Sequence, residues 1–395
     1  MKKLLQFGAG KIGRSFIAQV FSKAGYEIIF VDIDPCVVKS INEAGSYDVI
    51  IKSDEKEERY TVDQISAIDV TATRKVINAI MVTDIISISV GKKSLLKLAR
   101  ILARGIKNRY TEIPGAPVDI ILAENVRDAA SLLSAEIARR IPDVPVEAYV
   151  GFVETSIGKM VPLMTEEQTQ QDPLSVFAEP YNDLIVDARA FRAGIPDVSS
   201  LDPKENMKAW VDRKIFIHNL GHAVLAYHCN ALYPETKTTW EALDQHDLFE
   251  ITRATMLESA HILQHLYPSE FTMEELSAHI DDLLDRFANK ALGDTIYRVG
   301  CDIGRKLARD DRLMIPAEQA ARAGLDHDLI LRAWVRGCSF NAVDDQGKMF
   351  PEDRKFRNRY KEDPIRILRE HCNFDPTKDR SLFQEVEAII ENKGT

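Results

Sequence analysis

A mostly apolar segment near the middle of the chain carries polar side chains at spacings that suit acid–base chemistry. Residues 213–222 read R-K-I-F-I-H-N-L-G-H, and the chain continues as A-V-L-A-Y. On a helix that turns about 100° per residue, His222 falls about 80° and Asn219 about 140° from Lys214. The sequence therefore predicts that Lys214, Asn219 and His222 share one side of a helix and point into one cavity.

A lysine in such surroundings has a plausible chemical use. Burying an amine is costly unless it is paired or loses its proton. Desolvation lowers the pKa of a lysine, and Lys214 would then be a general base near neutral pH. A structural alternative stays open from spacing alone, with Lys214 at the helix surface and Asn219 and His222 as satisfied polar groups of the core.

Zinc binding is the rival chemical interpretation of this segment. The run H-N-L-G-H resembles the H-E-x-x-H zinc motif, but Asn219 stands where that motif has its general base. No third ligand occurs at a typical spacing. We therefore expect no metal site.

A second group of residues, near the N-terminus, has the spacing of a dinucleotide-binding turn. The turn is G-A-G-K-I-G, in which the residues are Gly8, Ala9, Gly10, Lys11, Ile12 and Gly13. Residues 3–7 predict a strand before it, residues 11–24 a helix after it, and residues 27–33 a second strand that ends in Asp32. This is one strand–helix–strand unit with an acid at the expected position.

Each part of that unit has a physical role. Gly8 permits the tight turn, Gly10 lets the backbone approach a pyrophosphate, and Gly13 lets the helix pack closely on the strand. The pyrophosphate would bind the N–H groups at the helix start. Asp32 would accept hydrogen bonds from ribose hydroxyls and repel a 2′-phosphate, which favours NAD over NADP. Two nearby cations, Lys11 and Arg14, would soften this preference, and a flavin is the other dinucleotide option.

The elements around these residues predict an α/β protein with two domains. Strands are expected at 48–52, 59–63, 66–70, 85–90, 118–122 and 146–153, and they alternate with helices such as 93–107. This alternation predicts a doubly wound Rossmann-type sheet in residues 1–193. The stretch 194–203 holds prolines and serines and is typical of a linker. Nearly every later segment has helical periodicity, so residues 194–395 predict a mostly α-helical substrate domain.

Composition excludes several classes of function. The 395 residues carry a net charge of -10, which disfavours nucleic acid and anionic membranes as partners. The five cysteines form no C-x-x-C pair, which is typical of a reducing compartment. No signal peptide or membrane-spanning run occurs. We therefore expect a cytoplasmic protein that acts on a small molecule.

Several stretches together resemble the polyol-specific long-chain dehydrogenases. The similarity extends over almost the whole chain. The stretches that carry it are F-G-A-G-K-I-G-R-S-F-I at 7–17, S-V-G at 89–91, L-A-E-N-V at 122–126, V-G-F-V-E at 150–154, R-K-I-F-I-H-N-L-G-H-A at 213–223, R-V-G-C-D-I-G-R-K-L at 298–307 and D-R-L at 311–313. The most specific motif is K-x4-N-x2-H, which Lys214, Asn219 and His222 match. The resemblance implies a metal-independent, NAD-dependent oxidoreductase of polyol metabolism, often a monomer.

The resemblance also implies roles for individual residues. Lys214 would be the general acid/base, Asn219 and Asn125 would hold the developing alkoxide, and His222 would orient a substrate hydroxyl. The cofactor would also contact Val90 and Gly91. Arg298 and Lys306 would line the polyol site, and Arg305 is a further cation. The expected pair is mannitol 1-phosphate and fructose 6-phosphate.

Some positions depart from the pattern of the family. Gly158 and Lys159 stand where relatives usually have an Asp-Arg pair, and Glu154 is the nearest acid that could compensate. Cys301 stands where an arginine is usual in the phosphate-specific members. An unphosphorylated polyol or a hexuronate is therefore the alternative substrate. A non-catalytic NAD-binding sensor is the alternative from another class.

Overall fold

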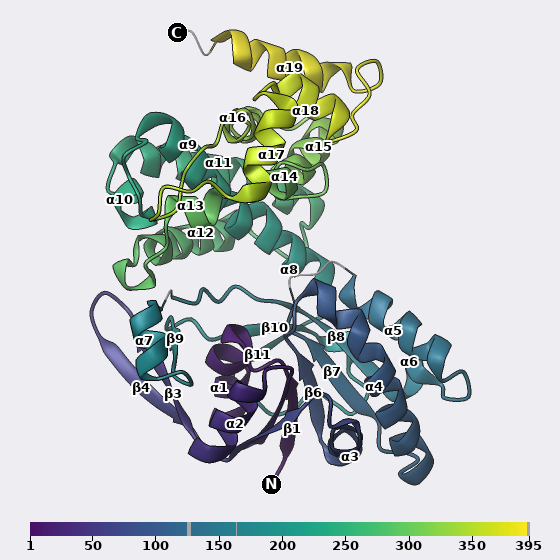
Figure 1. Cartoon of the computed structure of the whole chain (residues 1–395). Helices are drawn as coiled ribbons and strands as arrows, with labels where there is room; N and C mark the ends of the chain where they lie inside the picture. The colour runs from purple at the N-terminus through teal and green to yellow at the C-terminus, as the bar shows by residue number, and fades with distance from the viewer. Residues whose placement is uncertain (125–127, 163, 393–395) are drawn as a thin grey trace. The chain divides into compact units, whose positions relative to one another are not determined.

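The computed structural model describes residues 1–124, 128–162 and 164–392 (Figure 1). The chain divides into two compact units, Met1–Trp210 and Val211–Thr395, which we call the N-terminal and C-terminal units. The division falls within helix α8 (Met207–Arg213). The stretch after residue 193 includes strand β11 (Leu201–Lys204), which pairs with β10 (Leu184–Asp187) in the N-terminal unit.

The main sheet of the N-terminal unit has, within the described residues, eight strands in the order β11-β10-β8-β7-β6-β1-β2-β5. From β5 to β8 neighbouring strands are parallel, and β10 is antiparallel to β8. The strand order runs outward from β1 in both directions, so β1 and β6 meet at a topological switch point. The bounds are β1 (Lys3–Phe7), β2 (Glu27–Asp32), β5 (Ile65–Asp69), β6 (Ile85–Ile88), β7 (Val118–Leu122) and β8 (Val150–Ser156).

Helices cover both faces of this sheet because its strands are apolar on both sides. All five residues of β7, V-D-I-I-L, are buried. Leu4 packs in a cluster with Phe16 of the helix after the glycine turn, and Leu5 packs in a separate cluster with Ile80. The first cluster includes α2 (Pro35–Ala44), and the second includes α3 (Thr73–Val82), α4 (Lys92–Glu112) and α5 (Ala129–Arg140). The prediction of a doubly wound Rossmann-type sheet is confirmed.

Some local predictions for this unit were wrong. Residues 146–153 were expected to be a strand, but α6 (Val146–Tyr149) precedes β8. Pro145 at the start of α6 has φ -75°, which suits entry into a helical turn. The strands expected at 48–52 and 59–63 exist as β3 (Tyr47–Lys52) and β4 (Glu57–Val62), but they form a separate sheet with β9 (Val176–Ala178).

The C-terminal unit is mostly helical, as predicted. Its most buried helix is α9 (Leu220–Leu232), which packs against α11, α13 and α16. The other helices are α10 (Thr239–Leu243), α11 (His246–Leu266), α12 (Met273–Ala288), α13 (Ile296–Gly300), α14 (Ile303–Lys306), α15 (Met314–Ala323), α16 (Asp328–Gly337), α17 (Pro351–Tyr360), α18 (Pro364–Glu370) and α19 (Arg380–Glu391). Among the described helices, none is both long and apolar enough to cross a membrane.

The helix expected over 294–308 is interrupted between α13 and α14. Asp302 has φ +69°, a left-handed conformation that aspartate tolerates better than most residues. The buried Asp353 carboxylate accepts hydrogen bonds from Asp302 N at 3.0 Å and Ile303 N at 2.8 Å. These bonds stabilise the break, because they satisfy N–H groups that a continuous helix would have bonded internally.

Two wide helical turns occur where chemistry was expected. The segment η1 (Gly13–Ala18) follows the glycine turn, and η3 (Lys214–Asn219) begins at the predicted acid/base; both are π-helical. In η3 the wider hydrogen bond runs from Leu220 N to Ile215 O, five residues apart. Such turns are rare and frequently occur at functional sites.

Candidate functional site

The glycine turn follows β1 and leads into η1. Gly8 has φ +94°, and a Cβ on it would lie 2.3 Å from the backbone oxygen of Ser89. A Cβ on Gly13 would lie 2.1 Å from the backbone oxygen of Gly8. Apart from Gly10 itself and its two chain neighbours, no heavy atom of the described residues lies within 4 Å of the place where Gly10 would carry its Cβ. The turn is thus closed at Gly8 and Gly13 and open at Gly10, where a pyrophosphate was expected to approach.

Asp32 holds the glycine turn from the end of β2. Its Oδ2 accepts a hydrogen bond from Ala9 N at 2.6 Å, and its Oδ1 accepts one from Asp34 N at 2.9 Å. Asp69 lies opposite Asp32 in the parallel register of β2 and β5. Two acids therefore end adjacent strands, and their negative charge would oppose a phosphate on a bound ribose.

The cations beside the turn have different surroundings. Lys11 is exposed, whereas Ile12 packs on the core. Arg14 donates from Nε to Ala9 O at 2.8 Å and from Nη1 to Pro173 O at 3.0 Å, and it also binds Leu174 O. Burial lowers the pKa of Arg14. Its guanidinium therefore braces the turn through backbone carbonyl groups.

The S-V-G segment lies at the switch point, after β6. Ser89 N donates to Phe7 O at 2.8 Å, which places this segment beside the glycine turn. The carboxylate of Glu124 accepts a hydrogen bond from Gly91 N at 2.7 Å and another from Val90 N. Burial raises the pKa of Glu124. Glu124 was not predicted as a site residue, although an acid two residues after the end of a buried parallel strand was a usable signal. The neighbouring Asn125 lies outside the described residues.

The predicted acid/base helix is present, with one difference of geometry. Lys214 begins η3, Asn219 ends it, and His222 lies in the first turn of α9. Because a π-turn takes more residues than an α-turn, Asn219 lies closer to the direction of Lys214 than the angle for an α-helix indicates. The three predicted residues thus come from one continuous helical stretch.

The electrostatic surroundings of this helix favour neutral forms. Burial, and then the positive charge of Arg312, lowers the pKa of Lys214 to about 8. Burial also lowers the pKa of His222, and four cations lower it further, namely Arg298, Arg312, Lys306 and Arg286. His222 stacks on Phe287 with ring centroids 3.9 Å apart, and its buried Nε2 has no hydrogen-bond partner in the described part of the chain. A neutral imidazole with one unused nitrogen can bind a substrate hydroxyl.

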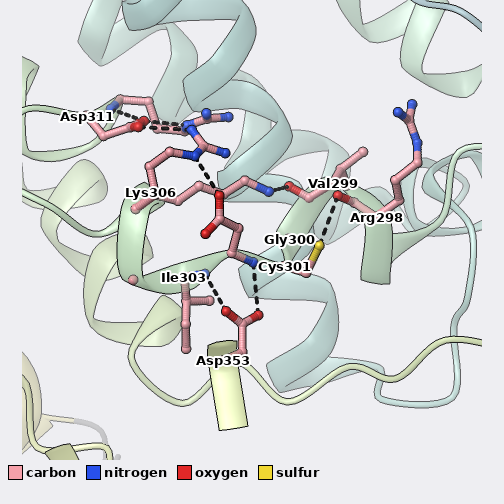
Figure 2. A network of polar contacts seen from close by, with 12 residues as sticks. Arg298, Val299, Gly300, Cys301, Ile303, Lys306, Asp311 and Asp353 are labelled. Carbon is pink, nitrogen blue, oxygen red and sulfur yellow. Dashed lines mark hydrogen bonds and ion pairs between the residues drawn. The ribbon is translucent and has the colours of Figure 1, made fainter. Parts of the chain in front are cut away.

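The predicted substrate residues lie on the two short helices. Arg298 forms an ion pair with the buried Asp294. Lys306 is 5% exposed, donates from Nζ to Val299 O at 2.6 Å, and has its pKa lowered by burial to about 7. Figure 2 shows Lys306 reaching this carbonyl, while the Arg298 side chain leads away from Lys306 and Asp311. Both cations nevertheless act on His222.

The residues that depart from the family pattern have defined contacts in the structure. A Cβ on Gly158 would make ordinary contacts with Tyr181, the nearest at 3.5 Å, so a side chain would fit. Lys159 donates to Glu179 O at 3.1 Å, Tyr181 O at 2.8 Å and Asn182 Oδ1 at 2.8 Å. Lys159 therefore joins two loops of the N-terminal unit. Glu154 accepts a hydrogen bond from Ala130 N at 3.3 Å.

Cys301 and Arg305 also have defined surroundings. The Cys301 thiol is half-buried and lies 3.6 Å from Arg298 O. Arg305 pairs with Asp302 at 2.6 Å and with Asp311 at 3.1 Å. Arg312, which was missed as a site residue, follows in the D-R-L motif. Over the residues described, no group of three or more His, Cys, Asp or Glu side chains is placed to hold a metal ion.

Comparisons with known proteins match both units. The family model described as the mannitol dehydrogenase Rossmann domain matches residues 2–200, and the mannitol dehydrogenase C-terminal domain matches residues 206–389. A mannitol-1-phosphate 5-dehydrogenase of Bacillus licheniformis is 30% identical over 97% of this chain and 98% of its own. Proteins of the same name from Streptococcus mutans and Halalkalibacterium halodurans are 31% and 29% identical, over 84% and 89% of this chain and 86% and 92% of their own.

Proposed function

Because this chain belongs to the mannitol dehydrogenase family, we propose that it is an NAD-dependent, metal-independent dehydrogenase that interconverts a polyol phosphate and a ketose phosphate. The best candidate pair is mannitol 1-phosphate and fructose 6-phosphate, after the names of relatives that align with nearly the whole chain. The observation that carries the chemistry is the desolvated Lys214, which shares one helical stretch with Asn219 and His222.

The residues of the N-terminal unit fit a nicotinamide dinucleotide. The open face at Gly10 leaves room for a pyrophosphate, and Asp32 lies at the end of the adjacent strand, where a ribose would bind. The acids Asp32 and Asp69 favour NAD over NADP because they would repel a 2′-phosphate. When bound, NADH supplies a hydride to the carbonyl carbon of the ketose.

The C-terminal unit supplies the acid and the orienting groups. In ketose reduction, the ammonium of Lys214 donates a proton to the carbonyl oxygen as that oxygen gains negative charge. The side-chain amide of Asn219 donates a hydrogen bond to the same oxygen, and an amide stabilises the charge without titrating. His222 binds an adjacent hydroxyl through its free Nε2. In polyol oxidation, neutral Lys214 accepts the proton.

The charge around His222 supports an anionic substrate. The groups that lower its pKa by their charge are all cations. A phosphate would bind favourably near such a cluster, because charged hydrogen bonds to phosphate are strong. A hexuronate also carries an anion, and Cys301 in place of an arginine favours this smaller charge, so a hexuronate is the second candidate.

The test is NADH oxidation with fructose 6-phosphate, fructose, fructuronate and tagaturonate, with NADPH as the alternative reductant. We expect fructose 6-phosphate to give the highest kcat/KM, and NADH to exceed NADPH. Equal or faster turnover of an unphosphorylated sugar would contradict the phosphate assignment. Binding of NADH, followed by fluorescence, without turnover of any of the four compounds would favour the non-catalytic sensor.

A further inference from the structure

A buried arginine outside the predicted site contacts the acid/base helix. Arg312, 8% exposed, lies just before α15. Its Nη1 donates to the backbone oxygen of Asn219 at 3.2 Å, across 93 residues of sequence. Its Nε donates to Asp311 Oδ1 at 2.8 Å. The guanidinium therefore links the end of η3 to a neighbouring carboxylate.

The carboxylate partner of Arg312 is itself held in place. Asp311 accepts from Arg305 Nη1 at 3.1 Å, and Arg305 Nε donates to Asp302 at 2.6 Å. The backbone at Asp302 is fixed by Asp353 of α17. Figure 2 displays Asp311, Lys306 and Asp353 within this network. Burying an arginine is costly unless its charge is paired, and Asp311 supplies this pairing for Arg312.

We propose that Arg312 is a positioning residue for the reaction, which fixes the end of η3 that carries Asn219 and holds a positive charge near Lys214. This inference rests on the proposed function, because it assigns Arg312 to the reaction of Lys214. A hydrogen bond from a charged donor to a carbonyl is stronger than a neutral one. Loss of this anchor would let the amide of Asn219 move, and small displacements of positioning groups are costly in catalysis.

Arg312 also acts on Lys214 through its charge. The pKa of Lys214 is lowered by burial first and then by Arg312. Among the other titratable or charged groups on its own segment and on α9, α11 and α12, Asp212 accepts from Tyr267, Arg253 pairs with Asp281, and Glu258 binds backbone N–H groups of α16. The pKa of His218 is lowered by burial and then by the charges of His222, Arg286, Lys214 and His279, so His218 also faces Lys214.

Two substitutions of Arg312 distinguish the effect of its hydrogen bond to Asn219 O from the effect of its positive charge. Arg312→Lys keeps the charge but not the planar fork. We expect kcat to fall about tenfold with little change in KM for NADH, and the pH profile to stay unchanged. Arg312→Met removes the charge as well. We expect a larger loss of kcat, with the kinetic pKa of the acid/base group raised by about one unit. Arg322→Met is the control, because the exposed Arg322 pairs with Glu318 on α15, and its profile should match the wild type.

A second readout does not depend on turnover. The rate at which acetic anhydride acylates Lys214, followed by mass spectrometry against pH, reports the pKa of this amine directly. We expect the titration to move to higher pH in Arg312→Met and to stay in place in Arg312→Lys. Wild-type titration and wild-type kcat in both folded variants would overturn the inference.

If the wild type turns over no compound of the panel, the proposed function fails, and the acylation titration alone still decides whether Arg312 acts on Lys214. If Arg312→Met does not fold, Arg312→Lys decides the outcome: a tenfold lower kcat supports the anchor, and an unchanged kcat overturns it.

Discussion

At the scale of single residues, burial and then the charge of Arg312 lower the pKa of Lys214 to about 8, which suits its proposed acid–base role. The environment produces this lowered pKa, because an exposed lysine would stay protonated in the same range. His222 shows the same effect in another group, since burial and nearby cations keep its imidazole neutral. Arg312 therefore favours the neutral form of both the Lys214 amine and the His222 imidazole.

Replacing the lysine tests its role directly. We expect Lys214→Ala to lower kcat on the order of 10²-fold or more, which is typical for loss of an acid/base group. NADH binding, measured by fluorescence titration, should change little. Lys355→Ala serves as the control, because Lys355 is exposed on α17. A Lys214→Ala enzyme with near-normal kcat would remove Lys214 from the mechanism.

The pH dependence follows from the lowered pKa of Lys214, which is about 8. Ketose reduction needs the protonated amine, so kcat for reduction should fall as pH rises through about 8. Polyol oxidation needs the neutral amine, so kcat for oxidation should rise through the same range. The measurement is the pair of pH–rate profiles in the two directions. Two profiles with the same slope would be inconsistent with a single acid/base group.

Sequence spacing indicates the candidate site residues that belong to local motifs. The glycine turn, Asp32 and the Lys214–His222 segment each follow from short-range patterns. Arg312 and Glu124 could not be assigned in this way, because their partners lie far along the chain, at Asn219 and at Val90 and Gly91. Long-range hydrogen bonds depend on tertiary packing, which spacing alone does not encode.

At the scale of elements, two glycines of the glycine turn allow close packing, and the third leaves space for a ligand. The positions of Gly8 and Gly13 are filled by neighbouring backbone atoms, whereas Gly10 borders open space. The long parallel strands were predictable because they form continuous apolar runs between two layers of helices. The short strands β9, β10 and β11 were missed because three or four residues carry too little pattern.

Two alanine substitutions test the difference between the packed position Gly13 and the open position Gly10. Gly13→Ala would place a methyl group against the Gly8 carbonyl, and we expect it to lower the free energy of unfolding by about 1–3 kcal/mol. Gly10→Ala should change that free energy by less than about 0.5 kcal/mol but weaken NADH binding, because the methyl group occupies the approach to the backbone. Urea unfolding and fluorescence titration measure the two effects. The reverse ranking of the two variants in stability would refute this account of the turn.

At the scale of the whole molecule, the chain has two compact units. The N-terminal unit has clusters of buried apolar residues on both faces of its sheet. Its candidate cofactor residues all lie within Met1–Trp210. The chain as a whole is acidic, with a net charge of -10, whereas cations surround His222. A local positive site on an acidic protein favours a small anion over a polyanionic polymer.

The division into units predicts the behaviour of a fragment. Residues 1–210 should fold alone and bind NADH with a Kd within about tenfold of the full chain, because each tenfold corresponds to only 1.4 kcal/mol. Circular dichroism and fluorescence titration would measure folding and binding. A folded fragment without measurable NADH affinity would mean that cofactor binding needs residues beyond 210.

The π-turn at η3 has a consequence for which changes of sequence length the protein tolerates there. A turn closed over five residues contains one more residue than an α-turn, so deleting a single amino acid between Lys214 and Asn219 would restore ordinary winding. Because a π-turn closes over five residues and an α-turn over four, such a deletion would leave the amine and the imidazole that follows it on the same side of the helix. A single deletion at an apolar position of this hexapeptide should therefore be tolerated better than a single insertion, which would turn the imidazole by about 100° relative to the amine.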